Sequence, residues 1–450
     1  MEKKLAGVLC FLLFTIMVSH AQRTLTMEEA VQLGLQNSKQ LKVSQDKIDE
    51  ALTKLDQARD LKYPDAKVSF QYLHALMLSR VIQIPGVTKD PIKIPFDFPA
   101  YLGTLSVSEP IFNGNQFKYA KQSADLMVQL SRLDADKDKD DITYLVISSY
   151  LNYNKILQNM LIVAQNMQDV QSKLEEITKY ESQGLATQND VLRFQLQKSQ
   201  QQLTEIELEN NRKIANYNLD IILGLPDTTT IMLPPVGYRT NEQLVYTDLL
   251  QTAETNRREL LDLGYQTKLA DVNVRQIHDK RLPTVAATGG MYCINPTGQV
   301  IPTHNNLIAP ITLGIGASWD IGTLYKNKNK EREAAVQRRE LNDSRDQVLD
   351  DIKQDVHKQF ILYQSALEKI KVLEVAVQQA QENERITESK YRNNLVNTTD
   401  RIDAQTQLYQ ARVNLELAKS DATVSYYDIL KATGKMHIQT QPKQFKQDHS

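Results

Sequence analysis

The chain has 450 residues, a formal net charge of −2 and a hydrophobic content of 41% with a single Trp. That length has room for two or three ordinary domains. The near-neutral charge gives no reason to expect nucleic acid as a partner, and the modest hydrophobic content argues against a chain built of transmembrane helices.

The N-terminus has the pattern of a secretory signal peptide. A short basic start at residues 1–4 precedes an apolar run from Leu5 to Val18, and small residues at 19 and 21 fit a cleavage site. We therefore predict a signal peptide over residues 1–21, with Gln22 as the first mature residue. The apolar run is short for a bilayer-spanning helix, and an uncleaved N-terminal anchor is the alternative.

After cleavage, Cys293 is the one cysteine left, so we expect no intrachain disulfide. No later stretch reaches the apolar length of a membrane-spanning helix. If the mature chain enters a membrane, it must therefore do so through a closed β-barrel, because open sheet edges are not tolerated in lipid.

The predicted elements follow one order twice along the chain. Each half reads as a helix closed by a proline, two strands of alternating pattern, a very long helix without Pro or Gly, and a shorter helix that ends at a glycine. In sequence numbers these are the first helix (26–61; 245–280), the strands (66–72 and 101–109; 285–293 and 311–320), the long helix (115–182; 325–392) and the last helix, ending at Gly224 or Gly434.

A constant offset in numbering shows that the two halves are repeats. The offset is 219 near the start of each half and 210 from the second strand onward. The matched pairs include Leu25 with Leu244, Asn37 with Asn256, Tyr153 with Tyr363, Gly184 with Asn394, and Gly224 with Gly434. We predict a first repeat over 22–240, a second over 241–436 and a flexible tail over 437–450.

The strands have one apolar and one polar face. In the segment 311–320, Ile311, Leu313 and Ile315 alternate with Thr312 and glycines, which is the pattern of a strand between lipid and a lumen. Four strands cannot close a barrel, so membrane insertion requires several copies with cyclic symmetry, and a trimer would supply twelve strands. A soluble four-stranded sheet is the alternative.

Aromatic residues recur at helical spacing in the long helices. Tyr150 and Tyr153 in the first repeat match Phe360 and Tyr363 in the second. We interpret them as packing residues between helices rather than as ligand-binding residues.

Several segments together carry a resemblance to a known family. They are LTMEEAVQLGLQNSKQL (25–41), IFNG (111–114), WDIG (319–322), the paired turns GLATQNDVL and NLVNTTDRIDA, and the ends ILGLP (222–226) and KATG (431–434). In this order, over essentially the whole mature chain, they resemble the TolC-type outer-membrane efflux proteins, also called outer membrane factors.

The resemblance implies a mainly α fold with a small β part. It implies a homotrimer in which four strands per chain form a 12-stranded transmembrane β-barrel in outer-membrane lipid. A long α-helical coiled-coil barrel would continue from it across the periplasm. Such proteins are passive exit ducts that dock on a periplasmic adaptor (membrane fusion) protein and an inner-membrane pump. The implied function is small-molecule efflux, with type I protein secretion as the alternative.

The resemblance also assigns roles to the two turns between the long and last helices. They would be the periplasmic hairpin tips that contact the adaptor, at Gly184-Leu185 and at Asn394-Leu395. Asn in place of Gly at 394 is tolerable, because Asn also adopts positive φ.

In the second repeat, the family often has two Asp residues three apart that form carboxylate rings around a narrow aperture. Asp400 and Asp403 have this spacing, and residues i and i+3 share a helix face. Such rings would favour bound cations. The alternative is that Asp400, like Asp190 in the first repeat, is only a first-turn helix charge or cap.

The resemblance implies a closing latch as well, between a Tyr before the second tip and an Asp after the first. The matching residues are Tyr391 and Asp190. Val396 stands where a family member has an additional basic residue, and Arg392 or Arg401 is a candidate substitute.

Two other classes of protein fit the sequence less well. For an enzyme, the sequence shows no metal-ligand spacing, phosphate-binding loop or nucleophile motif, so we expect no catalysis, cofactor or metal. A periplasmic coiled-coil adaptor or structural protein would have one helical hairpin and β-rich flanks, whereas this chain has two hairpins and few strands.

Overall fold

The computed structural model describes residues 22–76, 81–83, 85–86, 89–93, 97–234, 237–238, 244–296, 309–393 and 395–436. The predicted signal peptide (1–21) and tail (437–450) lie outside these residues. The chain divides into two compact units. The first comprises residues 1–46, 133–262 and 345–450, and the second comprises 47–132 and 263–344.

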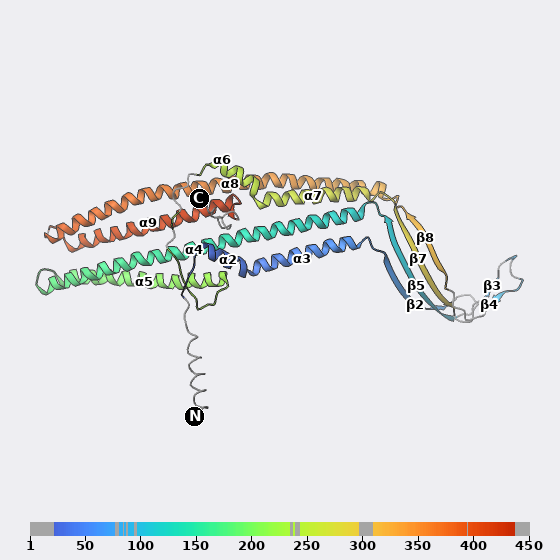
Figure 1. Cartoon of the computed structure of the whole chain (residues 1–450), viewed down its shortest axis with the longest axis horizontal. Coiled ribbons are helices and arrows are strands. Elements are labelled where there is room, and N and C mark those ends of the chain that lie inside the picture. Colours follow the sequence, from blue (N-terminus) through green and yellow to red (C-terminus); the bar gives the residue numbers. More distant parts are fainter. Residues whose placement is uncertain are drawn as a thin grey trace, which may run out of the picture. The chain divides into compact units, whose positions relative to one another are not determined.

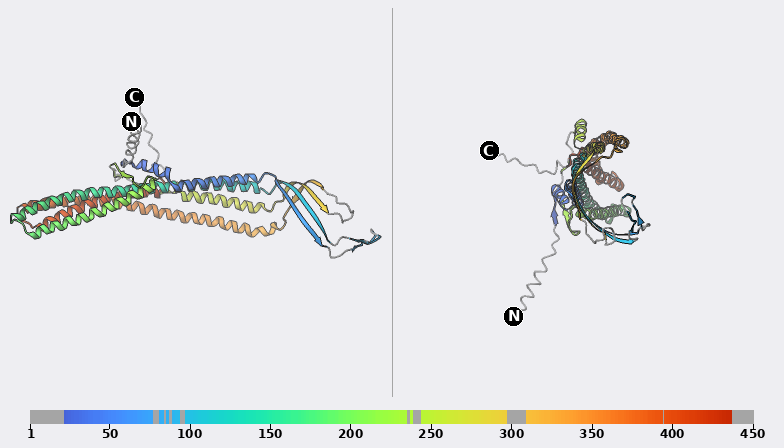
Figure 2. Two further views of the ribbon diagram at one scale, coloured as in Figure 1. Left: turned by 90° about the horizontal axis from the view of Figure 1, so that it is seen from below. Right: turned by 90° about the vertical axis from the view of Figure 1, so that its right-hand side faces the viewer.

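The second unit contains a four-stranded antiparallel sheet with strand order β2-β5-β7-β8. Each repeat contributes two strands, which Figure 1 shows side by side and Figure 2 shows as a curved sheet. The strands are β2 (Asp65–Leu76), β5 (Asp97–Phe112), β7 (Thr284–Pro296) and β8 (Ile311–Ser318). All four predicted strands are confirmed, most of them longer than predicted.

Strand register gives the sheet two chemically different faces. One row across the sheet pairs Val68 with Leu105, Leu105 with Met291, and Met291 with Ile311. The adjacent row, on the other face, joins Lys67, Ser106, Gly290 and Thr312. The apolar face is exposed in the single chain, since Val68 is 78% and Ile311 73% accessible.

The second unit also contains one end of each of four helices: α3 (Lys39–Asp60), α4 (Gln116–Ser182), α7 (Arg258–Asp279) and α8 (Thr323–Arg392). Ala51 and Leu55 on α3 pack with Val128 on α4. The Asn115 side chain donates a 2.8 Å hydrogen bond to Asp279. These contacts fix the helix ends where the strands begin and end.

The first helix of each repeat is not continuous, which corrects the prediction of single helices over 26–61 and 245–280. Ser38 separates α2 (Met27–Asn37) from α3, and Arg257 separates α6 (Tyr246–Asn256) from α7, each with ψ near 120°. At these breaks the Asn37 side chain donates to Leu223 O (2.7 Å) and the Arg257 guanidinium donates to Ala432 O (3.3 Å). A break therefore lets a side chain cap the end of another helix.

The long helices are unbroken, as predicted. They are followed by α5 (Gln188–Leu223) and α9 (Thr398–Ala432), and Figure 1 shows α4 beside α5 and α8 beside α9. Gly224 and Gly434 end the last helices with φ of +67° and +69°, the left-handed conformation that glycine adopts most easily. No helix among the described residues is both long and apolar enough to cross a bilayer.

The main core of the first unit combines aliphatic side chains with buried tyrosines. Tyr150, Tyr153 and Tyr363 are each about 1% exposed. The Tyr150 hydroxyl donates to Leu25 O at 2.9 Å and that of Tyr153 to Ile231 O at 3.0 Å, next to the short parallel pair β1 (Gln22–Thr24) and β6 (Thr230–Met232). Both phenols thus satisfy their polar group within the packed core, which agrees with the predicted packing role.

Candidate functional site

The first hairpin tip joins α4 to α5 through a glycine turn. Gly184 has φ of +74°, and its N–H donates to Glu181 O at 2.9 Å while that of Leu185 donates to Tyr180 O at 2.8 Å. These are the two hydrogen bonds of a Schellman motif. Nothing lies within 4 Å of the position a Cβ on Gly184 would take, so backbone conformation rather than space favours glycine there.

The second tip, between α8 and α9, repeats this geometry. The N–H of Leu395 donates to Lys390 O at 3.0 Å, as Leu185 does to Tyr180. Leu395 and Leu185 are both 73% exposed. Asn394 lies outside the described residues. Both tips therefore present one accessible leucine, and their contact with an adaptor stays a prediction.

A capping box begins the helix that follows each tip. The Asp190 carboxylate accepts from the N–H and hydroxyl of Thr187 at 2.9 and 2.6 Å. In the second repeat, the Asp400 carboxylate accepts from the N–H of Asn397 at 3.2 Å. The backbone N–H of Asp400 in turn donates to the Asn397 side-chain oxygen at 2.9 Å. Both Asp residues thus have a local structural role.

Hydrogen bonding also fixes the charge state of Asp190. Burial opposes the ionised form, but the donors of Thr187 and the hydroxyl of Thr398 outweigh it and hold the pKa of Asp190 below its ordinary value. Thr398 begins α9, so the pKa of Asp190 depends on groups at the starts of both last helices. Asp190 is therefore ionised throughout the neutral range.

Asp403 differs from Asp400. It is exposed, one helical turn further on, and no hydrogen bond or ion pair joins it to any other described residue of the chain. Its carboxylate therefore has no structural role within a single copy.

The predicted latch residues lie in one neighbourhood. Tyr391 packs against the apolar cluster of Ile177, Val191 and Phe194 next to Asp190. Among the described residues, Tyr391 and Asp190 are not hydrogen-bonded to each other; the Tyr391 ring lies 4.5 Å from the Arg401 guanidinium carbon. The latch stays a prediction.

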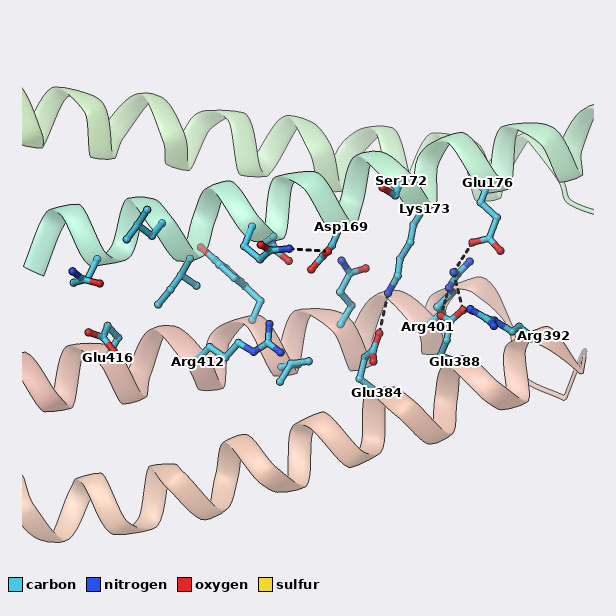
Figure 3. Close-up of a pocket in the computed structure, with 18 residues that line it drawn as sticks. Asp169, Ser172, Lys173, Glu176, Glu384, Glu388, Arg392, Arg401, Arg412 and Glu416 are labelled. Atoms are coloured by element: carbon cyan, nitrogen blue, oxygen red, sulfur yellow. Dashed lines mark hydrogen bonds and ion pairs between the residues drawn. The ribbon is translucent and has the colours of Figure 1, made fainter. Parts of the chain in front are cut away.

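Arg401 is the centre of a charged cluster that connects three helices (Figure 3). Its side chain is 3% exposed. One nitrogen, Nη2, donates to Glu176 of α4 at 2.6 Å and to Glu388 of α8 at 3.0 Å, and Nε donates to Glu388 at 2.8 Å. A single buried cation on α9 thus holds one carboxylate from each hairpin. We call Arg401, Glu176 and Glu388 the Arg401 clamp.

The ionisation of these groups is mutually supported. Burial opposes the charge of Glu388, but Arg401 outweighs it, and the pKa of Glu388 lies below its ordinary value. Burial likewise opposes the charge on Arg401, whose pKa the two carboxylates nevertheless raise. Removing one partner would leave buried charge without compensation.

The clamp closes one end of an open groove of about 640 Å³ between α4 and the second hairpin. Two further ion pairs border it, Lys173 with Glu384 at 3.0 Å and Arg392 with Glu388 at 3.1 Å (Figure 3). Charged side chains of both signs therefore line the groove, and these two ion pairs lie next to the clamp.

Sequence reasoning considered Arg401 only as a possible addition to the latch and did not find Glu176 or Glu388. One signal was available: Arg401 shares a helix face with Ala404, Gln405 and Leu408, all of which are buried. A lone basic residue in a buried stripe predicts carboxylate partners.

Two hairpins with equivalent tips, and one sheet that takes two strands from each repeat, define a class of tandemly duplicated, mainly helical proteins. The family model described as outer membrane efflux protein matches residues 30–225 and 249–435. The chain belongs to this outer membrane efflux protein family. It is thus an outer-membrane protein that extends into the periplasm and serves in transport.

Individual relatives agree with this assignment. The alkaline protease secretion protein AprF of Pseudomonas aeruginosa is 22% identical over 343 residues, 74% of this chain and 69% of AprF. The outer membrane protein VceC of Vibrio cholerae has a similar structure, with a TM-score of 0.72, 15% identity and coverage of 91% of this chain and 96% of VceC. The MtrE channel of Neisseria gonorrhoeae has a TM-score of 0.70 and 14% identity, with coverage of 92% of this chain and 91% of MtrE.

Proposed function

We propose that three copies of the chain form a passive exit duct that receives its cargo from an inner-membrane pump through a periplasmic adaptor. The observation that carries this is the sheet: β2 and β8 are its edges, and its apolar face is exposed. In lipid, unpaired edge groups each cost several kcal/mol, so each edge strand would pair with the opposite edge of the next copy.

Small molecules are the proposed cargo. Membership of the outer membrane efflux protein family supports efflux. The likeness to AprF supports the second candidate, in which the cargo is a secreted protein.

The proposal is tested by expressing the chain in a host that lacks its own exit ducts, together with a periplasmic adaptor and an inner-membrane pump from the organism of origin. We expect a trimer in the outer-membrane fraction, dissociated by heating, and a fall in the accumulation of a fluorescent pump substrate. A soluble monomer in the periplasm would contradict the duct. An outer-membrane trimer that restores secretion of a protease but not dye efflux would favour the second candidate.

The hairpin tips are the proposed adaptor contacts. The equivalence of the two turns supports this, because each presents one exposed leucine, Leu185 or Leu395, at the matching position. Their equivalence would offer the adaptor two similar contact points per copy.

Asp400 and Asp403 are proposed to form carboxylate rings at the aperture, with Asp403 as the stronger candidate because it has no partner among the residues that the structure describes. Changing both to Asn should reduce cation selectivity and weaken block by divalent cations in planar-bilayer recordings. Asp421→Asn is the matched control, since it removes an exposed carboxylate of the same helix, one that pairs with Lys155 at 2.8 Å, and leaves the proposed rings intact. Selectivity and block that match the wild type in the double variant would disprove the rings.

The closing contact is proposed to include the Arg401 clamp beside Asp190 and Tyr391. Arg401 joins a carboxylate of α4 to one of α8, so separating the two hairpins of one copy requires breaking it. The buried position of the guanidinium makes that separation costly.

A further inference from the structure

A basic groove lies in the second unit where the first repeat passes from sheet to helix. It has a volume of about 700 Å³ and lies between the end of α3, the end of β5 and the start of α4. Its charged lining consists of one carboxylate, Asp125, and four cationic side chains, Arg59, Lys62, Lys118 and Lys121. We call it the basic groove. Its charge is strongly positive in a chain whose net charge is near zero.

Comparison with the second repeat shows why the positive charge of the basic groove is unusual. By the repeat offsets, Lys62 corresponds to Arg281 and Lys121 to Glu331. In the second repeat, Arg281 and Glu331 form an ion pair between the end of α7 and the start of α8. The first repeat instead places two lysines at these positions. At this helix junction the second repeat therefore has a carboxylate, Glu331, that pairs with the basic residue. The first repeat has Lys121 in its place.

In the part of the chain that the structure describes, the lysines of the basic groove have no ion-pair partner. Among the described residues, no carboxylate lies within ion-pair distance of Lys62, Lys118 or Lys121, whereas Arg59 pairs with Asp56 at 2.8 Å. Lys118 and Lys121 are three residues apart and share a face of α4. Like charges gathered in this way repel one another, and an external anion would relieve the repulsion.

One wall of the basic groove is apolar. Ile111, Phe112 and Phe117 line it, and Ile111 is 61% exposed. Phe112 pairs with Val285, which pairs with Ala317 on β8, so Phe112 continues the apolar face of the sheet. A ligand held here would meet cations at one end and an apolar surface that leads onto the sheet at the other.

We propose that the basic groove binds the phosphate group of an anionic membrane phospholipid. Lys62, Lys118 and Lys121 contact the phosphate oxygens, and the glycerol and first acyl carbons lie against Ile111 and Phe112. The lipid phosphate takes the place that Glu331 occupies in the second repeat. A free phosphate has no apolar part to contact the apolar wall. An acidic peptide has no acyl chain to lie on the apolar face of the sheet. This inference rests on the proposed function, since it requires the sheet to lie in a bilayer.

The substitution Lys121→Glu tests the proposal. It gives the first repeat the residue type found at position 331 of the second, so that Lys62 should form an ion pair with the new carboxylate. Purified wild-type and variant trimers in detergent would be titrated with phosphatidylglycerol and, separately, phosphatidylcholine, and bound lipid counted by native mass spectrometry. We expect about tenfold weaker phosphatidylglycerol binding in the variant, since each basic side chain near an anionic headgroup contributes measurably to binding. Lys330→Glu, an equal charge change at an exposed position of α8, should bind as the wild type does.

Lys121→Gln serves as a second variant in case the Glu substitution prevents assembly, and should weaken binding to an intermediate degree. Equal phosphatidylglycerol affinity in the wild type and both Lys121 variants would overturn the proposal. So would displacement of the lipid by inorganic phosphate or by poly-glutamate at equal concentration, which would mean an anion or peptide site instead. Wild-type trimers that reach the outer membrane but do not prefer phosphatidylglycerol would disprove this site alone; failure to reach that membrane would count against the proposed function.

Discussion

An Arg401→Met variant should lose about 3 kcal/mol of stability and show a clearly lower thermal unfolding midpoint, because removing one member of a buried ion cluster leaves the other charges uncompensated. Met keeps an unbranched chain of similar reach. Glu176 and Glu388, which now accept three hydrogen bonds from Arg401, would then face each other without the cation between them. The measurement is thermal unfolding of the purified trimer at neutral pH.

Two further variants separate charge from packing. Adding Glu176→Gln and Glu388→Gln to Arg401→Met removes all three charges and should restore most of the lost stability, because replacing a whole buried cluster by neutral groups is often harmless. Arg385→Met is the matched control. That arginine pairs with Glu382 on α8 at 2.7 Å but is 68% exposed, and exposed pairs contribute little.

The Arg401→Met variant should also change the permeability of the duct if the Arg401 clamp helps to hold the hairpins together. We expect higher single-channel conductance and greater sensitivity of the host to a large hydrophilic antibiotic that enters through an open duct. Unchanged stability in Arg401→Met would refute the energetic role of the clamp. Lower stability with unchanged conductance and sensitivity would leave it a structural cluster and remove it from the closing contact.

The sequence predicted the repeated elements and the tips because local patterns determine them. A run of residues without Pro or Gly predicts each long helix, and the alternation at 311–320 predicts a two-faced strand. Gly184 predicts a left-handed turn because few other residues accept positive φ. The capping role of Asp190 and Asp400 was also foreseen as an alternative, since their position three residues after Thr187 and Asn397 completes a capping box.

The features that the sequence did not reveal depend on distance in space. Ser38 and Arg257 break helices without any Gly or Pro, and at these breaks the side chains of Asn37 and Arg257 cap the ends of other helices. The clamp joins residues 225 positions apart, Glu176 and Arg401, and no periodicity links them. The basic groove likewise became meaningful only once the structure showed Arg281 bound to Glu331.

Asp220 should make the protein less stable at neutral pH than at mildly acidic pH. It is fully buried on α5. One carboxylate oxygen accepts from the Asn216 side chain at 2.7 Å, and the other has no hydrogen-bond partner among the described residues. Burial, assisted by the charge of Asp227, raises the pKa of Asp220 to about 6. The ionised form is thus disfavoured in the folded state.

The sign of the pH dependence follows from this shift. In the unfolded chain the carboxyl ionises near its ordinary pKa of about 3.9, so between pH 4 and 6 the folded state binds the extra proton. Stability therefore falls as pH rises through this window and stays lower above it. Asp220→Asn removes the charge while keeping an acceptor for Asn216. We expect it to stabilise the protein by up to about 3 kcal/mol at pH 7.5, since each pKa unit corresponds to about 1.4 kcal/mol.

The decisive comparison is the difference in thermal midpoint between variant and wild type, measured at pH 7.5 and at pH 4. That difference should be large at pH 7.5 and close to zero at pH 4, where both Asp220 and its Asn replacement are neutral. Asp227→Asn is the matched control. Because Asp227 is exposed and acts on Asp220 only through its charge, its replacement should stabilise the protein much less. A midpoint difference for Asp220→Asn that is the same at both pH values would mean that packing or hydrogen bonding, and not the buried charge, determines the effect of this residue.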